Sequence, residues 1–342
     1  MIIYCYNSKP QFLLCFLALY FQGMSVFVIR FIFKLCYNSK IIIILKKIIL
    51  KIAKSIFVPF LKMLLRIRMG RELFFLSMPK NQLVIAHTNE GIDFLVNTSD
   101  LTIGSTTFID QKSYDANHLI TALALIGSSK SILIDVGANI GTIGIFGISK
   151  GYFKKCIAFE PEPKNFKLLR SNVFLNDLSE KFELRNEALS NQKNEKLNFS
   201  LSENNHGDHR ALPQQLSGQL NEENRKVIKV DVNTLDSALE MYELDECLLF
   251  IDSQGFEGHI LSGAKNLIQK SVPIVMEFWP SQLSITEGLG LLYEALSESS
   301  YTAMWDLSNP AVKIKFSIEN LKKIELKYQL NGSYTDLVLV NE

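Results

Sequence analysis

The chain has 342 residues, and 36 Lys and Arg side chains against 35 Asp and Glu leave a formal charge of +1. Hydrophobic residues make up 47% and charged residues 21%, which excludes a disordered or collagen-like chain. The near-zero charge argues against a general nucleic-acid-binding protein. Residues 1–71, however, contain twelve Lys or Arg and no Asp or Glu, which leaves 24 basic and 35 acidic side chains, a balance of −11, in residues 72–342.

The basic segment 1–71 has the pattern of a helical, membrane-associating region. Residues 10–29 carry no charge, and as a helix they would measure about 30 Å, enough to cross a bilayer core. Farther on, cations recur at helical spacing among apolar residues, as in a helix lying in the headgroup plane; they are Lys47, Lys51, Lys54, Lys62 and Arg66. Because such lysines favour the anionic cytoplasmic leaflet, we expect a cytoplasmic protein attached to the inner face of the plasma membrane. A true span, a translation start at Met24 and an ordinary packed helix remain alternatives.

After residue 71 the pattern becomes globular. Residues 72–130 read as two short strands, 81–88 and 91–97, followed by a helix over 114–126. Residues 131–342 alternate apolar strands with helical stretches; the predicted strands are 131–137, 155–161, 181–189, 248–255, 273–279 and 335–341. A further pair, 196–202 and 226–232, reads as a hairpin around a long polar loop. This alternation predicts an α/β fold, with a parallel sheet covered by helices on both faces.

The first strand end carries the residues Asp135-Val136-Gly137-Ala138-Asn139-Ile140-Gly141. Glycines here allow a tight turn, and the following helix presents free N–H groups. Glu160 ends the next strand, 25 residues after Asp135, where a carboxylate can accept hydrogen bonds from both ribose hydroxyls of a nucleoside. The GxGxxG fingerprint is absent, and Asp135 would repel a pyrophosphate but suits a sulfonium and an ammonium group. The pattern therefore favours S-adenosyl-L-methionine over NAD.

With these segments, the sequence resembles the FkbM-type methyltransferases. The resemblance rests on ILIDVGANIGTIGIF, IAFEPEPKNFKLLRSNVFLN, ELRNEALS, NNHGDHR and FIDSQGFEGHILSGAKNLIQKSVPIVMEFWP, and it is strong over residues 131–280. It implies a Rossmann-like, doubly wound, mostly parallel seven-stranded sheet with an antiparallel last strand, and O-methylation of a hydroxyl on a sugar, a glycan or glycolipid, or a secondary metabolite. The family often has Lys where this chain has Phe250.

The resemblance also implies positions for the cofactor. The methionine end would lie against Asp135, Gly137, Asn139 and Gly141, and Glu160 would hold the ribose. The turn that contains Asn186 and Ala188 would lie near the adenine. The methyltransferase domain would then occupy residues 131–342.

Polar residues at further strand ends and in the long loop are candidates for acceptor chemistry. A base near the acceptor hydroxyl assists transfer, and His209, Asp252 and Glu277 are the catalytic candidates. Asp252 is an equally good helix cap, and a histidine in a polar loop is often merely solvated. The candidates for substrate binding are Asp208, Arg210, Gln254 and Glu257.

Five cysteines without a CxxC pair indicate neither a zinc site nor a disulfide framework, and no carboxylate spacing has a metal signature, so no metal is expected. Two other functions remain open. One is an NAD-dependent oxidoreductase or epimerase acting on sugar nucleotides, although neither GxGxxG nor YxxxK occurs. The other is a non-catalytic protein tethered to a membrane.

Overall fold

The computed structural model describes residues 58–128, 130–193, 195–212 and 225–342, together with Lys47, Lys51 and Ser55. The chain divides into two compact units, residues 1–67 and 68–342. In the first unit, helix α4 covers Val58–Leu64, with Pro59 in its first turn, where a proline is tolerated. Most of the predicted membrane-associating segment lies outside the described residues. Among the described helices, none is both long and apolar enough to span a bilayer.

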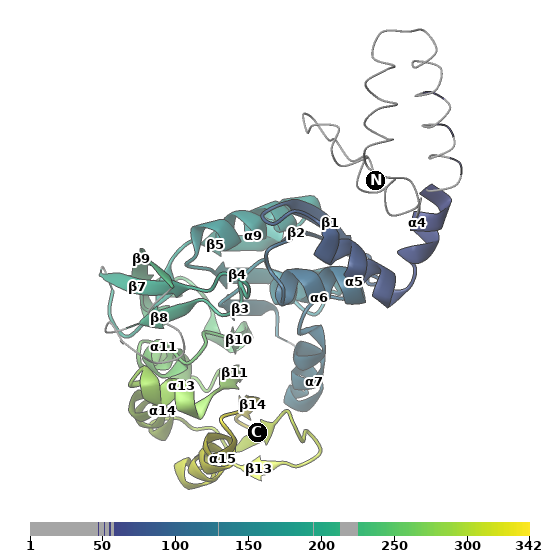
Figure 1. The fold of residues 1–342 in the computed structure, drawn as a ribbon. Coiled ribbons are helices and arrows are strands. Elements are labelled where there is room, and N and C mark those ends of the chain that lie inside the picture. Colours follow the sequence, from purple (N-terminus) through teal and green to yellow (C-terminus); the bar gives the residue numbers. More distant parts are fainter. Residues whose placement is uncertain are drawn as a thin grey trace. The chain divides into compact units, whose positions relative to one another are not determined.

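The second unit opens with a helix, a hairpin and two further helices (Figure 1). Their bounds are α5 Arg68–Ser77, β1 Leu83–His87, β2 Asp93–Asn97, α6 Ile103–Asp110 and α7 Ala116–Ile126. The strands β1 and β2 pair antiparallel, and Phe94 and Val96 alternate into the core, as the period of two in a strand requires. The strands and the helix predicted for this region are confirmed.

The main sheet has eight strands in the order β13-β12-β14-β11-β10-β3-β4-β5. Their bounds are β3 Ile132–Val136, β4 Lys155–Phe159, β5 Phe182–Arg185, β10 Cys247–Ile251, β11 Ile274–Phe278, β12 Ala303–Asp306, β13 Ile314–Lys315 and β14 Thr335–Val340. The strands from β5 to β11 run parallel, and β14 is antiparallel to both of its neighbours. The Rossmann-like prediction with an antiparallel last strand is confirmed. The sheet has eight strands rather than seven because β13 adds two residues at its edge.

The order of strands reverses beside β3. The chain runs from β3 to β4 and β5 on one side, and then crosses to β10 and β11 on the other. In open α/β sheets, ligands bind at such a reversal, outside the carboxyl ends of the strands. The fold therefore places a ligand site where β3, β4 and β10 end.

Helices cover both faces of the sheet. One face carries α7, α8 and α9, and the other carries the helices from α10 to α15. The remaining bounds are α8 Thr142–Ser149, α9 Pro163–Leu175, α10 Leu235–Ala238, α11 Glu257–Ser262, α12 Lys265–Gln269, α13 Pro280–Ile285, α14 Gly288–Ser297 and α15 Ile318–Asn331, with single 3₁₀ turns η2 Ser179–Lys181 and η4 Leu244–Glu246. Leu133 faces the first layer and Ile134 the second, since side chains alternate along a strand.

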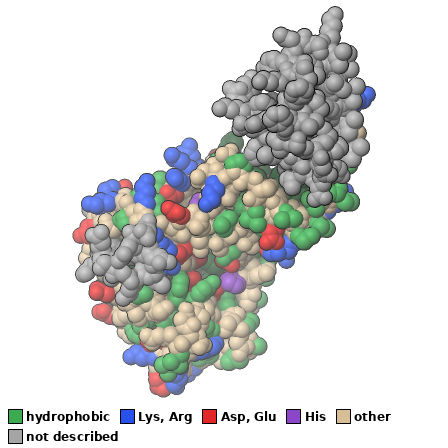
Figure 2. Space-filling view, in the orientation of Figure 1, with side chains coloured by type: hydrophobic (Ala, Val, Ile, Leu, Met, Phe, Trp, Pro, Cys, Tyr) green, Lys and Arg blue, Asp and Glu red, His purple; other side chains and the backbone are tan. Residues whose placement is uncertain are grey.

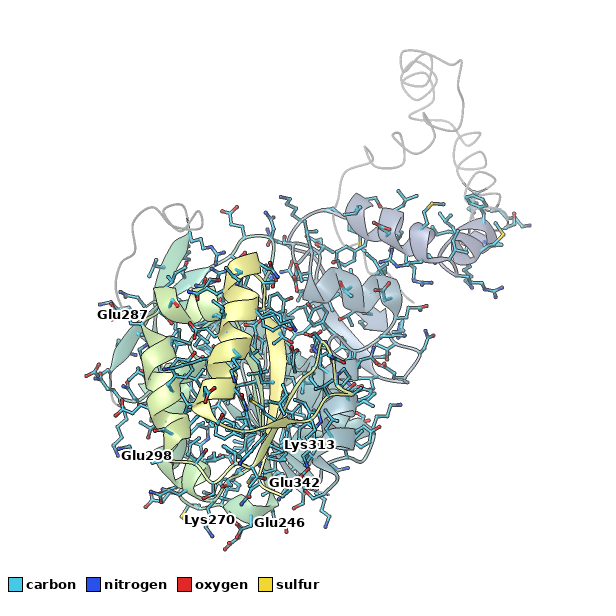
Figure 3. All side chains as sticks on the ribbon, turned by 90° about the horizontal axis from the view of Figure 1, so that it is seen from below. Glu246, Lys270, Glu287, Glu298, Lys313 and Glu342 are labelled. Carbon is cyan, nitrogen blue, oxygen red and sulfur yellow. The ribbon has the colours of Figure 1, made fainter. Side chains whose placement is uncertain are left out.

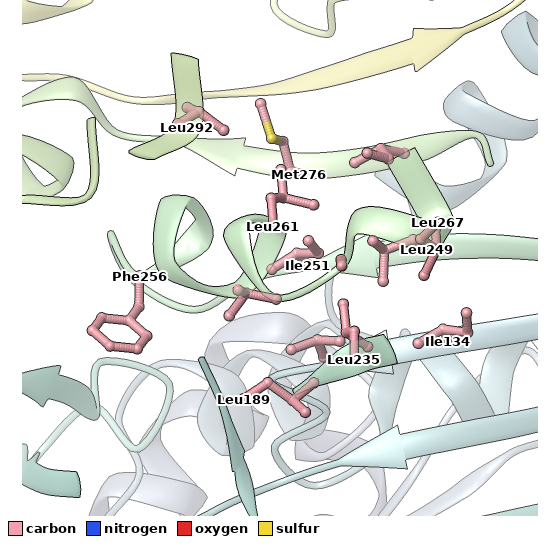
Figure 4. Close-up of a cluster of buried hydrophobic side chains, with 14 of the residues drawn as sticks. Ile134, Leu189, Leu235, Leu249, Ile251, Phe256, Leu261, Leu267, Met276 and Leu292 are labelled. Atoms are coloured by element: carbon pink, nitrogen blue, oxygen red, sulfur yellow. The ribbon is translucent and has the colours of Figure 1, made fainter. Parts of the chain in front are cut away.

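The second layer is a closely packed apolar core (Figure 4). Ile134, Ile251 and Met276 project from three neighbouring strands toward Leu261 and Leu292, and all five are fully buried. Burying one such side chain stabilises the fold by roughly 1.5–3 kcal/mol. This core fixes the strand ends that position the site.

A smaller sheet, ordered β6-β9-β7-β8, stands beside the main one (Figure 1). Its strands are β6 Ala188–Leu189, β7 Lys196–Leu201, β8 Arg210–Leu212 and β9 Lys226–Asn233. The predicted hairpin pair is confirmed as the antiparallel strands β7 and β9. The segment between β7 and β8, residues 202–209, reaches the carboxyl edge of the main sheet, where Asn139 contacts it.

The amino edge of the main sheet is charged and exposed. Glu246, Lys270 and Glu298 are exposed at the outer surface (Figure 3). Each precedes a strand of the sheet, so they mark the edge opposite to the strand ends described above.

Candidate active site

The turn after β3 brings two backbone segments into close contact. Gly137 has φ +83°, and a Cβ on it would lie 1.8 Å from the carbonyl oxygen of Asp252, which follows β10. Gly141, with φ +92°, precedes α8, and its Cβ would lie 2.6 Å from Leu169. The two glycines therefore allow these close contacts within the protein. The packing requires glycine at both positions whether or not a ligand is bound.

Glu160 lies at the end of β4 with its carboxylate held by backbone groups. Its Oε2 accepts the Asn139 N–H at 2.9 Å, and its Oε1 accepts the Glu162 N–H at 2.8 Å. The side chain is 4% exposed and lines a cavity at the carboxyl edge of the sheet. Burial raises the pKa of Glu160 to about 8, against the lowering effect of these hydrogen bonds. Lone pairs remain on both oxygens for a ligand hydroxyl.

Asp135 lies elsewhere, which corrects its predicted role at the methionine end. Its side chain points to the α8 face of the sheet, where Oδ2 accepts the Gly144 N–H at 3.1 Å. It is 2% exposed and is not among the residues that line the cavity. Burial raises the pKa of Asp135 to about 7. The observed contact stabilises the first turn of α8, while Val136, the next residue, lines the cavity.

The cavity combines carboxylates with an apolar wall. Glu160 and Asp252 line it from β4 and β10, together with Gly137 and Asn139. Its apolar lining includes Ala188, Leu189, Phe199, Ala211, Phe256 and Ile260. Its volume is about 50 Å³, which is enough for a few water molecules.

The part of the lining that comes from residues 202–209 lies over the cavity, and we call these residues the covering segment. The carbonyl oxygen of His206 accepts hydrogen bonds from the amides of Asn139, at 2.9 Å, and Asn165, at 3.0 Å. On the other side, the Leu101 N–H donates to the Asn204 carbonyl at 2.8 Å. These hydrogen bonds join the segment to the turn after β3, to the start of α9 and to the residues between β2 and α6.

His209, at the end of the covering segment, does not fit the predicted role of a base. Its Nδ1 accepts the Ser202 N–H at 3.0 Å, which leaves the ring proton on Nε2. Burial, reinforced by the neighbouring His206, lowers the pKa of His209 to about 3. The imidazole is therefore neutral and lines the cavity as a hydrogen-bond donor.

Asp208 and Arg210 pair with each other, and neither lines the cavity. Arg210 is 5% exposed, donates to Gln282 at 3.2 Å and lies over the ring of Trp279 at 5.2 Å. Asp208 also accepts from Arg225 at 2.5 Å. These contacts fix the covering segment to α13 and to the start of β9, so the two residues are structural and are not the predicted substrate ligands.

The strand ends of β10 and β11 bring together two of the catalytic candidates. The Gln254 amide nitrogen donates to Asp252 Oδ1 at 2.7 Å and to both oxygens of Glu277 at 3.3 Å. Burial, as the largest cause, raises the pKa of Asp252 to about 8 and that of Glu277 well above its usual range. Asp252 and Gln254 line the cavity, and Glu277 lies behind them.

Glu257 shapes the turn after β10. Its Oε1 accepts the Ser253 N–H at 3.0 Å, the Ser253 hydroxyl at 2.8 Å and the Gly255 N–H at 3.3 Å. It is fully buried and does not line the cavity, so a role in the turn replaces its predicted contact with substrate. Asp252 does not cap the following helix: α11 has no side-chain cap, and Asp252 Oδ1 accepts the Gln254 amide instead.

The two residues predicted to lie near the adenine differ in their positions. Ala188 lines the cavity, but the Asn186 amide donates to the carbonyl oxygens of Glu160, at 2.8 Å, and Pro161, at 3.1 Å. Asn186 therefore fixes the turn after β4 instead of facing a ligand. Phe250, in the position where Lys is common, is 5% exposed and packs in the apolar layer.

Sequence reasoning missed several cavity residues. Asn165 and His206 are the clearest: both lie in segments that carried the family resemblance, but neither has a strand-end position. Phe199 and Phe256 looked like ordinary core residues. Only the fold brings these four side chains to one cavity.

The residues around the cavity fit a nucleoside cofactor with a cationic end. Glu160 offers acceptors for ribose hydroxyls, and the apolar wall suits a purine. Asn139 is 9% exposed, and its Oδ1 has no hydrogen-bond partner among the described residues, so a cavity ligand could donate to it. In the same part of the chain, no three His, Cys, Asp or Glu side chains are grouped to hold a metal ion.

Residues 135–301 match the family model of the methyltransferase FkbM domain. No curated protein matches the chain. Among solved structures, a methyltransferase FkbM from Methylobacillus flagellatus is 15% identical, with 62% of this chain and 43% of that one covered at a TM-score of 0.36. A putative O-methyltransferase from Klebsiella pneumoniae is 13% identical, with 66% and 81% covered at 0.36. P. horikoshii TYW2 in complex with MeSAdo is 11% identical, with 78% and 74% covered at 0.36.

The chain thus spans less than half of the M. flagellatus protein, and these overall similarities are too low to carry any conclusion about chemistry. The family match covers the turn after β3, Glu160, the covering segment and the Asp252–Glu277 region. Residues 135–301 of this chain therefore belong to the FkbM methyltransferase family.

Proposed function

We propose that this methyltransferase uses S-adenosyl-L-methionine to methylate a hydroxyl group of a sugar, a glycan or glycolipid, or a secondary metabolite. The observation that carries the proposal is that two carboxylates, Glu160 and Asp252, line one cavity where the strand order reverses. Neutral or cationic groups suit this lining better than a pyrophosphate does, which supports this cofactor over NAD.

In the proposed reaction, S-adenosyl-L-methionine supplies an electrophilic methyl group when bound. Glu160 accepts hydrogen bonds from the ribose, and Asn139 accepts one from the polar end of the cofactor. Asp252 would take the proton of the acceptor hydroxyl. The methyl carbon would exchange its bond to the cofactor sulfur for a bond to the acceptor oxygen, and the neutral thioether would leave. A carboxylate whose pKa is about 8 is a much stronger base than an ordinary aspartate, and its proton affinity matches neutral pH.

A small acceptor also agrees with the surface. On the face drawn in Figure 2, the Lys and Arg side chains of the described residues are interspersed with Asp and Glu. A nucleic acid would call for a continuous basic surface. On this face, the mixed charge fits a small-molecule or glycan acceptor better than RNA.

Isothermal titration with S-adenosyl-L-methionine tests the cofactor. We expect binding by the wild type and about tenfold weaker binding by Glu160→Ala, because a buried hydrogen bond to a charged group contributes roughly 1.5–3 kcal/mol. Glu180→Ala is the matched control, since Glu180 is exposed on η2. No heat with the wild type, or equal affinities in the two variants, would contradict the proposal. Mass spectrometry of host glycans and metabolites with and without this gene would then identify the acceptor by one missing methyl group.

We also propose that residues 1–71 attach the enzyme to an anionic membrane surface. The twelve cations without an acidic residue support this, as do Phe60 and Met63 of α4, which are 50% and 58% exposed. In a flotation assay with phosphatidylserine vesicles, the full chain should float and the chain without residues 1–71 should not. Equal flotation of the two would refute it.

A further inference from the structure

The turn after β10 has an unusual backbone that directs one amide side chain. Gln254 has φ +56° and Gly255 has φ +93°, and the left-handed region is unfavourable for a residue such as glutamine. Two structural features hold the turn in this shape. Glu257 accepts three hydrogen bonds from Ser253 and Gly255, and a Cβ on Gly255 would lie 2.4 Å from the Gln282 side chain.

The amide of Gln254 lies between two carboxylates. One of its two N–H groups reaches Asp252 Oδ1 at 2.7 Å, and the other is shared between the oxygens of Glu277, each 3.3 Å from the nitrogen. Two neighbouring buried carboxylates oppose each other's ionisation. A neutral donor that bonds to both reduces this conflict, and it also holds each carboxylate in one orientation.

Asp252 is surrounded by further charges and phenols from several elements. Glu257 and Glu277 belong to α11 and β11, and Asp336 belongs to β14. The groups near α7 and the start of β14 are Asp115, Tyr114, His118 and Tyr334. Arg210 is a cation that acts on Glu277. Four of these eight groups are carboxyl groups, which oppose the ionisation of Asp252, and the short hydrogen bond from Gln254 favours it.

We propose that Gln254 is a positioning residue, which orients Asp252 at the cavity and favours its ionised form by bridging it to Glu277. This inference rests on the proposed function, because it gives Gln254 its role through the base of that reaction. It replaces the predicted contact of Gln254 with substrate: the amide N–H groups are already used by the protein.

The test compares two ligands that differ in charge, S-adenosyl-L-methionine and the uncharged-sulfur product S-adenosyl-L-homocysteine. Titration calorimetry from pH 6 to 9 gives the ratio of their affinities. In the wild type, the ratio should rise toward the sulfonium compound as Asp252 ionises. In Gln254→Met, which keeps the volume and removes both donors, the midpoint of this rise should shift upward by about one pH unit.

Three controls make the result specific. Gln269→Met, at an exposed position of α12, should leave the midpoint unchanged. In an Asp252→Asn background, Gln254→Met should cause no shift. Gln254→Asn keeps the amide on a side chain that is one methylene shorter, so the amide no longer reaches both carboxylates. This variant should shift the midpoint in the same direction, and it replaces the Met variant if that one does not fold.

An unchanged midpoint in folded Gln254→Met, or a shift that persists in the Asp252→Asn background, would overturn the inference. A wild type that binds neither compound would instead contradict the proposed function, so the two failures are distinguishable.

Discussion

At the scale of single residues, Gly137 marks the closest approach of the turns after β3 and β10. A Cβ there meets a backbone oxygen that cannot move away, whereas a Cβ on Gly151 meets nothing within 4 Å. Both glycines have positive φ, +83° and +74°. A comparison of Ala substitutions at the two positions therefore distinguishes the effect of the close contact from that of the left-handed backbone.

We expect Gly137→Ala to lower the free energy of unfolding by about 3 kcal/mol or more, and Gly151→Ala by about 1 kcal/mol, which is the cost of the left-handed conformation alone. Urea unfolding of both variants measures the difference. Equal losses would show that the turn after β10 moves away without penalty.

Strand periodicity explains which strand-end carboxylates reach the cavity. Asp135 is inside β3 and shares the orientation of Leu133, so it faces α8. Glu160 and Asp252 follow the last residues of β4 and β10, where the chain turns over the carboxyl edge. The sequence predicted these strand ends, and the same period of two could have excluded Asp135 from the cavity.

At the scale of elements, the covering segment forms part of the lining of the cavity. Its His206 carbonyl is held by two amides, and Asn165, at the start of α9, supplies one of them. Asn165 is 1% exposed, so in the closed segment no water can replace its hydrogen bond.

Asn165→Ala should therefore release S-adenosyl-L-homocysteine roughly fivefold faster, because a neutral hydrogen bond contributes about 1 kcal/mol. Stopped-flow fluorescence measures the dissociation rate, and Asn266→Ala on α12 is the exposed control. If dissociation is as slow as in the wild type, the segment does not limit release.

At the scale of the whole molecule, the buried carboxylates link stability to pH. Burial raises the pKa to about 7 in Asp135 and to about 8 in Glu160 and Asp252, from ordinary values near 4. The folded protein then holds more protons than the unfolded chain. The stability that these protonated groups contribute is therefore greatest at low pH and is lost as pH rises through their pKa values in the folded protein. The lowered pKa of His209 has the opposite effect on the pH dependence of stability, but only below the ordinary histidine pKa of 6.5.

Between pH 6.5 and 8, we therefore expect the free energy of unfolding of the ligand-free protein to fall, by up to about 1.4 kcal/mol per pH unit for each group still protonated. Guanidinium unfolding at several pH values measures this slope. Asp135→Asn, which keeps an acceptor for the Gly144 N–H, should flatten it. A stability that is constant or rises over this interval would contradict the burial of these groups.

The sequence by itself determined the alternation of strands and helices, the strand ends that carry Glu160 and Asp252, and the family to which this region belongs. These follow from local patterns, because hydrophobic period and turn residues act over a few positions. Only the tertiary structure decided the partners of Arg210, His209 and Gln254. Their burial depends on elements that the fold brings together, and Arg210 and Gln254 also bond to Gln282 and Glu277 on other elements. These contacts identify a structural ion pair, a neutral donor and a bridge between two carboxylates.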